Sequence, residues 1–200
     1  MLKIDRPRDV ARDICRKYGV SLSSETLSRF AAILEPQKLI RGKNPVQEGE
    51  VCRYLYYLTY GLVLQYYRRD GVTITEDIAH EGDMMVCVES FFTQQPSTVM
   101  LTTLEPSVLF GIPYDGLYEL ASTSYDVCSL IFAIEQSFLL HAKKWADVIR
   151  FGSAKERYLH LMRENPEVVR RAPLHHVASL LQITPETLSR VRNQVNLELY

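Results

Sequence analysis

Four glycines divide one stretch of the chain into nearly equal intervals. Gly49, Gly61, Gly71 and Gly82 are 12, 10 and 11 residues apart, and the segments between them are rich in Tyr, Val, Leu, Thr and Ile. Strands of that length at that spacing are typical of an antiparallel barrel or a double-sheet jelly roll. The Asp70-Gly71 pair is the strongest hairpin signal in the stretch. The expected strands are 51–58, 62–67, 72–78, 99–104 and 108–112.

Helical patterns flank this β-rich stretch. Before it, Leu27, Phe30, Ala31 and Leu34 follow the spacing of an amphipathic helix that ends at Pro36. From about residue 116 a long apolar seam begins, with members 4, 3, 4, 3, 4 and 3 residues apart, a coiled-coil a/d pattern kept for about three heptads. We expect this helix to pair two subunits, and packing on its own roll is the alternative. The seam residues are Val127, Ile131, Ile134, Phe138, His141, Trp145 and Val148.

Residues 174–195 predict two short helices that meet at a sharp turn. One inward stripe runs from Val177 to Leu181 and another from Leu188 to Val195, with a break at Gln182-Ile183. Thr184 can accept hydrogen bonds from free amides at the start of the second helix. Pro185 follows at the first helical position, where its missing N–H costs nothing. The turn needs a left-handed residue, and this chain has Gln182 there instead of the usual Gly.

The second helix carries a polar face opposite its apolar stripe. Glu186, Ser189, Arg190 and Asn193 stand at i, i+3, i+4 and i+7. Arginine can pair bidentately with guanine, and glutamate can accept from the cytosine amino group. The same Glu and Arg also form an ordinary i,i+4 ion pair worth roughly 0.2–0.5 kcal/mol on any exposed helix. We expect a helix-turn-helix that enters the major groove of DNA. Its expected contacts are Thr184, Pro185, Glu186, Thr187, Ser189, Arg190, Arg192 and Asn193.

The charge of the chain is unevenly distributed. The formal net charge is −1, but residues 141–200 hold ten Lys and Arg against six Asp and Glu. A local basic bias of this kind supports contact with phosphates. The expected backbone contacts are Arg170, Arg171, His175, His176 and Arg192, each of which can also be ordinary surface charge.

Composition excludes several other classes of protein. An apolar fraction of 46% supports real cores, and no apolar run approaches the eighteen residues of a membrane span. The first residues lack the apolar core of a signal peptide, so we expect a cytoplasmic protein without membrane contact. The four cysteines, Cys15, Cys52, Cys87 and Cys128, are scattered singly, which favours reduced core thiols over a disulfide frame, a zinc site or an iron–sulfur cluster. No metal ligand set is expected.

The order of these elements resembles the Crp/Fnr family of bacterial transcription regulators over nearly the whole chain. Residues 46–50, 57–63 and 82–83 stand where the family has the turn motifs of its β-roll. The stretch Glu186-Thr187-Leu188-Ser189-Arg190 is similar to the family's Glu-Thr-x-x-Arg recognition sequence. The base-reading Glu and the distal Arg therefore fall on Glu186 and Arg190, while the family's more N-terminal Arg falls on Pro185. The stretch between 165 and 173 is too short for the β-hairpin wing that many members have.

The family's cyclic-nucleotide pocket is altered in this chain. The Gly-Glu pair that holds the ribose falls on Val86-Cys87, and Glu89 is two residues out of register. The phosphate-binding Arg should lie near Ser97-Thr98, but no Arg or Lys occurs from 82 to 113. A buried phosphate without a cation loses its charge-assisted pair, so cAMP binding is not expected. Haem and iron–sulfur cofactors are not expected either. The effector, if there is one, would meet Gly82, Val86, Cys87, Glu89, Ser97 and Thr98.

These observations predict an α+β chain in three parts. Residues 1–115 form an antiparallel β-roll with flanking helices, 116–150 a long coiled-coil dimerisation helix, and 151–200 a small all-α helix-turn-helix domain. The expected function is that of a homodimeric regulator that binds a palindromic double-stranded DNA operator, with RNA polymerase as a further candidate partner. The alternative is a ligand-binding or protein-interaction module whose helix pair serves only packing. An enzyme ranks third, since no phosphate loop, catalytic triad or paired metal ligands are visible.

Overall fold

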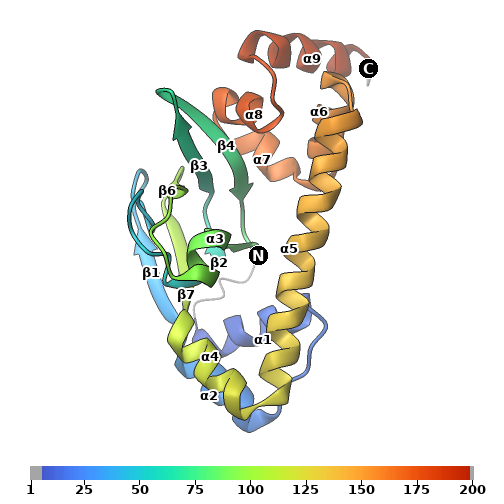
Figure 1. The fold of residues 1–200 in the computed structure, drawn as a ribbon. Helices are drawn as coiled ribbons and strands as arrows, with labels where there is room; N and C mark the ends of the chain where they lie inside the picture. Colours follow the sequence, from blue (N-terminus) through green and yellow to red (C-terminus); the bar gives the residue numbers. More distant parts are fainter. Residues whose placement is uncertain (1–5, 199–200) are drawn as a thin grey trace.

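The β-roll is built from two antiparallel sheets. The computed structural model describes residues 6–198. Glycine at position 61 is required at one sheet corner, because it adopts φ +105° and a Cβ would lie 2.2 Å from Ser107 Oγ. The double-sheet roll expected from the glycine spacing is confirmed (Figure 1). One sheet has the order β1 (Glu35–Leu39), β7 (Ser107–Pro113), β2 (Tyr54–Tyr60), β5 (Met84–Met85), and the other β4 (Val72–Ala79), β3 (Val63–Arg69), β6 (Met100–Thr103).

One strand prediction needs correction, and the strands β1 and β5 were not predicted. The first expected strand started at Val51, but Val51 makes only an isolated bridge with Pro96 and the continuous ladder starts at Tyr54. The edge strand β1 was not predicted, because its sequence of Glu, Pro, Gln, Lys and Leu has little β-propensity and the strand forms by pairing with β7. The hairpin signal was correct: Asp70 and Gly71 both have positive φ between β3 and β4.

Four helices cover one end and one edge of the roll. They are α1 (Pro7–Lys17), α2 (Ser24–Ala32), α3 (Val88–Thr93) and α4 (Tyr114–Thr123). In Figure 1, α1, α2 and α4 lie together at the end of the roll far from α9. A first core joins α1, α2, α4 and the start of α5 to the inner side chains of both sheets, and Ile14, Phe30, Tyr57 and Phe110 are fully buried in it.

The helix α5 (Tyr125–Phe151) links the two ends of the molecule. It starts beside α4, runs along one side of the roll and reaches the C-terminal helices (Figure 1). None of the helices within residues 6–198 is long and apolar enough to cross a membrane.

Four short helices follow, and they share a core with one sheet. The helix α6 (Ala154–Glu164) begins with a capping box between Ser153 and Glu156, and α7 (Pro166–Arg171), α8 (Leu174–Leu180) and α9 (Pro185–Glu198) follow. Their apolar side chains pack against those of β3, β4 and β6, which contribute Leu64, Tyr66, Ile78 and Met100, and against Leu62 just before β3. The C-terminal helices therefore rest directly on the roll.

Candidate nucleic-acid interface and ligand cavities

The turn between α8 and α9 has the geometry that the sequence predicted. Gln182 takes the left-handed conformation with φ 53°. Thr184 Oγ1 accepts from the Thr187 amide at 3.2 Å, and Pro185 is the first residue of α9. Leu181 and Leu188 are fully buried on either side of the turn. This packing fixes the position of α9 relative to α8.

The outer side of α9 is a polar surface that we call the reading face, formed by Glu186, Ser189, Arg190 and Asn193. All four residues are exposed, while Leu188, Val191 and Val195 between them point into the core. Hydrogen bonds from the backbone of Glu186 and from Thr184 lower the pKa of the Glu186 carboxyl, and Arg190 adds to this effect. Glu186 is therefore an acceptor at neutral pH and Arg190 a donor. Thr187 is half-buried, with its hydroxyl 3.2 Å from that of Thr184.

Arg192 is not on the reading face. Its Nη2 donates to the Val169 carbonyl at 3.2 Å, and its guanidinium lies over the Tyr158 ring, 5.8 Å from the centroid. The Arg192 Nε is buried without a hydrogen-bond partner. The expected DNA contact at this residue is therefore corrected. Arg192 connects α9 to α6 and α7 inside the helical unit, by which we mean the helices α6 to α9.

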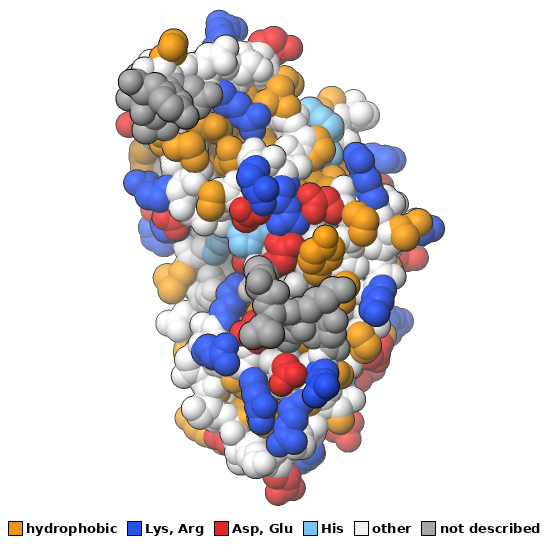
Figure 2. All heavy atoms as spheres, turned by 180° about the vertical axis from the view of Figure 1, so that it is seen from behind, with side chains coloured by type: hydrophobic (Ala, Val, Ile, Leu, Met, Phe, Trp, Pro, Cys, Tyr) orange, Lys and Arg blue, Asp and Glu red, His pale blue; other side chains and the backbone are white. Residues whose placement is uncertain are grey.

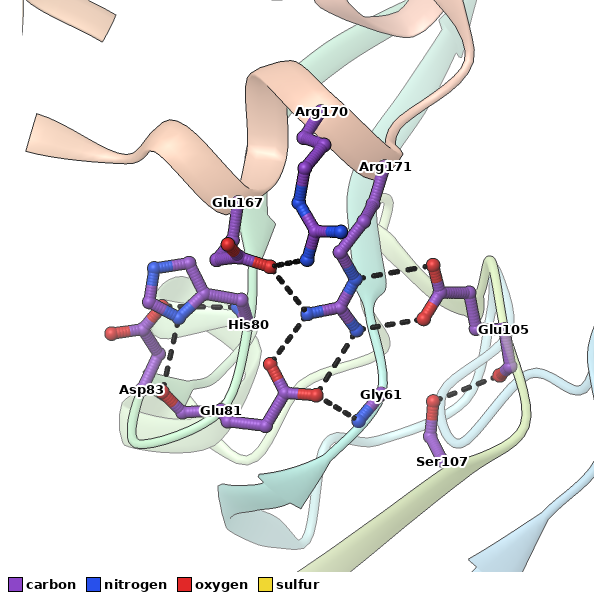
Figure 3. Close-up of polar contacts among 9 residues, drawn as sticks. All are labelled: Gly61, His80, Glu81, Asp83, Glu105, Ser107, Glu167, Arg170 and Arg171. Atoms are coloured by element: carbon purple, nitrogen blue, oxygen red, sulfur yellow. Dashed lines mark hydrogen bonds and ion pairs between the residues drawn. The ribbon is translucent and has the colours of Figure 1, made fainter. Parts of the chain in front are cut away.

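Arg171 is also committed to the protein itself. Figure 3 shows its guanidinium between acidic side chains from α7 and from two turns of the roll. Arg171 donates to both Glu81 oxygens, at 2.6 and 3.0 Å, and to both Glu105 oxygens, at 3.2 and 2.7 Å. Glu167 lies 3.5 Å from Arg171 Nη1. The expected phosphate contact at Arg171 is corrected. The Arg171 cluster consists of Glu81, Glu105, Glu167 and Arg171.

The charges of the Arg171 cluster stabilise one another. Burial alone would raise the pKa of the Glu81 carboxyl, but hydrogen bonds from Arg171 and from the Gly61 amide, 2.8 Å away, outweigh it and leave this pKa lowered. Hydrogen bonds to Glu105 and Glu81 raise the pKa of Arg171. Glu81 and Arg171 are therefore charged at neutral pH, and the Arg171 cluster attaches α7 to the β4–β5 and β6–β7 turns.

The other expected phosphate contacts differ in exposure. Arg170 is exposed and pairs with Glu167, and His175 is exposed beside His176, with ring centroids 4.0 Å apart. Burial and the charge of His175 lower the pKa of His176 to about 4, so His176 is neutral at pH 7. Figure 2 shows basic and acidic side chains intermixed at mid-height on the back of the molecule, without one continuous basic area there.

A large cavity of about 810 Å³ opens between β4, β5 and α5. Its walls combine apolar side chains, including Val86, Phe138 and Trp145, with charged ones. Lys17 on its edge is already bound, since its Nζ donates to Gly82 O at 2.5 Å and to Asp83 Oδ1 at 3.2 Å. Burial raises the pKa of the Asp77 carboxyl, and the charge of His141 opposes this. The wall residues with ionisable side chains are Lys17, Glu76, Asp77, Asp83, His141 and Arg150.

A second cavity of about 460 Å³ contains most of the expected effector residues. Cys87, Glu89, Ser97 and Thr98 line it, whereas Val86 lines the large cavity and Gly82 lines neither. The Ser97 hydroxyl is used internally, because it donates to the Val99 carbonyl at 2.7 Å. The charged groups lining this cavity are Glu76 and Glu89, both acidic. A phosphate placed here would meet negative charge without a cation.

The first part of the α5 seam faces its own subunit, which corrects the expected dimer contact at Val127 and Ile134. Val127 and Ile134 are buried in the first core, and Ile131 and Phe138 pack against it. Farther along, His141 and Trp145 line the large cavity. The 4-3 spacing correctly predicted an apolar helix face. The roll covers its first part, while His141 is exposed and Trp145 half-buried at the large cavity.

Comparisons with known proteins agree with this architecture. Residues 36–124, from β1 to the end of α4, match the family model of the cyclic nucleotide-binding domain. The structure of FixK2 from Bradyrhizobium japonicum superposes with a TM-score of 0.70 and 19% identity, covering 83% of this chain and 86% of that one. A putative transcriptional regulator of the Crp/Fnr family from Eubacterium rectale superposes with a TM-score of 0.64 and 17% identity. The match covers 88% of this chain and 85% of that one. The chain has the Crp/Fnr fold.

A third structure with the Crp/Fnr fold extends the comparison. CLP from Xanthomonas campestris, described as a c-di-GMP responsive global regulator, superposes with a TM-score of 0.65 and 21% identity, covering 88% of this chain and 93% of CLP. A comparison with curated protein sequences finds no significant match. Within residues 6–198 of this Crp/Fnr fold, no group of three or more His, Cys, Asp or Glu side chains is arranged to hold a metal ion.

Proposed function

We propose that this protein is a homodimeric, sequence-specific DNA-binding transcriptional regulator of the Crp/Fnr type. The observation that carries the proposal is the reading face: four exposed hydrogen-bonding side chains on α9, held in place by the buried contacts of Leu181 and Leu188. Its proposed role is to bind DNA, with no catalytic step.

In this proposal α9 lies in the major groove and α8 crosses the backbone. Arg190 donates to guanine O6 and N7, and Glu186 accepts from a cytosine amino group. The lowered pKa of Glu186 supports this role, because a protonated carboxyl would accept less strongly. Ser189 and Asn193 complete the contact with the bases. The candidates for phosphate contact are the exposed His175 and Arg170, the latter paired with Glu167 in the free protein.

The proposed dimer interface lies on the outer face of α5, opposite the seam. Tyr125, Phe132 and Leu139 are exposed there at i, i+7 and i+14, the positions that face one partner along a coiled coil. Phe132 is 66% exposed and Leu139 70%. A second copy of this chain can cover the same stripe with its own, because a two-fold interface is self-complementary. The two reading faces would then meet major grooves about one helical turn apart, roughly 34 Å.

The structure also suggests how the roll can influence DNA binding. Asp83 lines the large cavity, and two residues earlier Glu81 binds Arg171 on α7. A ligand in the large cavity that shifts this turn would change the contact and bias the position of the helix pair. The acidic lining of the second cavity supports an effector other than a cyclic nucleotide.

Selection of bound sequences from random double-stranded oligonucleotides tests the proposed function. We expect a palindromic motif with two half-sites whose centres are about 10–10.5 base pairs apart, one helical turn of DNA. Recovery of no enriched motif, with affinity no greater than for random DNA, would reject the assignment in favour of a module that does not read DNA.

A further inference from the structure

The hairpin formed by β3 and β4 extends from the roll to the helical unit. In Figure 1 its tip reaches the level of α8, at the end of the molecule that carries α9. The strand β4 is an edge strand of its sheet, and its free edge lies against α8. The Ser179 hydroxyl on α8 accepts from the Thr75 amide at 2.9 Å and donates to the Thr73 carbonyl at 3.5 Å. The hairpin is therefore attached to the first helix of the helix pair.

One arginine near the tip of the hairpin lies on the side of the helices. Successive side chains of a strand point to opposite faces. Leu64 and Tyr66 on β3 are buried in the core shared with the helical unit, whereas Val63 belongs to the first core. Arg68 follows Tyr66 by two positions and therefore shares the face that packs against the helices. Arg69 points to the opposite face, and both arginines are exposed.

Several cations of the helical unit are not free for the DNA backbone. Within residues 154–198 all the regular elements are helices, so this described part has no β-hairpin wing to add contacts. Arg171 and Arg192 are bound inside the protein, and Arg170 pairs with Glu167. By contrast, the Arg68 side chain has no ion pair or hydrogen bond with any residue from 6 to 198. A free cation thus stands beside the helix pair, on an element of the roll.

We infer that Arg68 binds a backbone phosphate of the DNA beside the half-site that α9 reads. This inference rests on the proposed function, and it gives the roll a direct part in DNA binding. Because α8 crosses the DNA backbone in that function, a cation held beside α8 lies close to the phosphates that flank the major groove. The Arg68 guanidinium donates charge-assisted hydrogen bonds to phosphate oxygens and releases counterions, and it reads no base.

The hairpin itself supplies a matched control. Arg69 has the same charge and is the next residue, but its side chain lies on the face away from the helices. It is 78% exposed, and its Nε lies 4.0 Å from a carboxylate oxygen of Asp70, which offsets its charge. A phosphate contact at the helix side of the hairpin therefore requires Arg68 and not Arg69.

Salt titration of DNA affinity tests the contact. Fluorescence anisotropy measures the Kd for the selected operator from about 50 to about 200 mM salt, where the logarithm of affinity falls linearly with the logarithm of salt concentration. In Arg68→Ala the slope should decrease by about one for each subunit, and affinity at low salt should fall several-fold. The loss should be equal for operators with one altered base pair. Arg68→Lys should keep most of the slope, because an ammonium also contacts phosphate.

The control variant and the parent protein decide between the outcomes. Arg69→Ala should change the slope much less than Arg68→Ala, and circular dichroism checks that each variant is folded. An unchanged slope in Arg68→Ala would overturn the inference and leave the hairpin open to a protein partner. Equal losses in the two variants would also overturn it, since they would show only the effect of net charge.

Failure of this inference is distinguishable from failure of the proposed function. A parent protein that selects no operator rejects both. A parent protein that selects an operator, with the same salt slope in Arg68→Ala, rejects the phosphate contact alone. A loss of affinity in Arg68→Ala that depends on the base sequence of the operator would make this residue a base reader and would also reject the phosphate contact.

Discussion

Arg171 on α7 and Glu81 on the β4–β5 turn form a two-point ion pair across 90 residues of sequence, with N–O distances of 2.6 and 3.0 Å. Glu105 binds the same guanidinium from the β6–β7 turn. Because the planar Arg171 guanidinium binds two carboxylates at once, it restrains the orientation of α7 relative to the two turns as well as its distance from them. The helical unit is therefore held to the roll by the Arg171 cluster in addition to the apolar core that they share.

Arg171→Ala should destabilise the protein by roughly 3 kcal/mol, the lower end for breaking a buried ion pair, because two carboxylates lose their partner. Arg170→Ala is the matched control at the next residue: the Arg170 side chain is 69% exposed, against 15% for Arg171. Urea denaturation of the two variants gives the comparison. Equal stability of the two variants would show that the Arg171 cluster contributes nothing to the folded state.

Glu186→Ala and Arg190→Ala should leave stability nearly unchanged and each remove about 1–3 kcal/mol of discrimination between the selected site and sites with one altered base pair. The reason is that both side chains are exposed and would contact bases directly. Fluorescence anisotropy with matched and altered oligonucleotides measures this. Arg12→Ala, at an exposed position of α1 at the other end of the molecule, is the control. Unchanged base preference in both reading-face variants would contradict the assigned contacts.

Phe132→Glu combined with Leu139→Glu should convert the proposed dimer to monomers, since four carboxylates would gather in an apolar interface. Ile40→Glu with Val72→Glu is a matched control, because these residues of the roll are similarly exposed, at 67% and 57%. Sedimentation velocity distinguishes monomer from dimer. A dimer that persists in the α5 variant, with its fold intact, would place the interface elsewhere.

Cyclic AMP and cyclic GMP should produce no saturable heat in titration calorimetry and no change in DNA affinity. The second cavity places Glu76 and Glu89 where a phosphate would need a cation. Saturable binding at micromolar concentration would show that another cation, such as Arg150 on the edge of the large cavity, completes the site. In that case, the same calorimetric titration of the Arg150→Ala variant should show no saturable heat.

Stability should fall as pH decreases from about 6.5 to about 4, and His176 should account for part of the fall. The pKa of His176 is lowered to about 4 in the folded protein, so over this range the unfolded chain binds the proton and the folded chain does not. The pH-dependent fall in stability should be smaller in His176→Gln than in the parent. His175→Gln, at the exposed neighbouring position, should retain most of the pH-dependent fall in stability. Identical pH profiles for the parent and His176→Gln would contradict the lowered pKa.

Local features were predictable from the sequence because short-range geometry determines them. The Thr184 cap, the left-handed Gln182 and the Asp70-Gly71 hairpin all depend on neighbouring residues, and the structure confirms them. The reading face also follows from helical periodicity, since exposed and buried residues alternate along α9 as the spacing predicts.

Features that depend on distant partners could not be predicted. The spacing of Val127 and Ile134 indicated an apolar face, but periodicity does not say whether a partner helix or the subunit's own core covers it. The sequence predicted a phosphate contact or ordinary surface charge for Arg171. Its internal role could not be foreseen, because its acidic partners come from turns 66 and 90 residues away. For Arg192 the sequence does hold a signal, since on a helical wheel this residue lies beside the apolar stripe of α9.

The core that the C-terminal helices share with β3, β4 and β6 limits how this protein can be recombined. A helix pair that rests on its own small core can be exchanged between homologues at a linker, and a chimera then inherits a new operator preference. Here a graft of residues 151–200 alone would leave Leu62, Leu64 and Ile78 of the host sheet facing a foreign surface. Under the proposed function, a change of operator preference through Glu186 and Arg190 keeps that contact intact. On this proposal, substitution at these exposed positions is a more accessible route to new target sites than domain exchange.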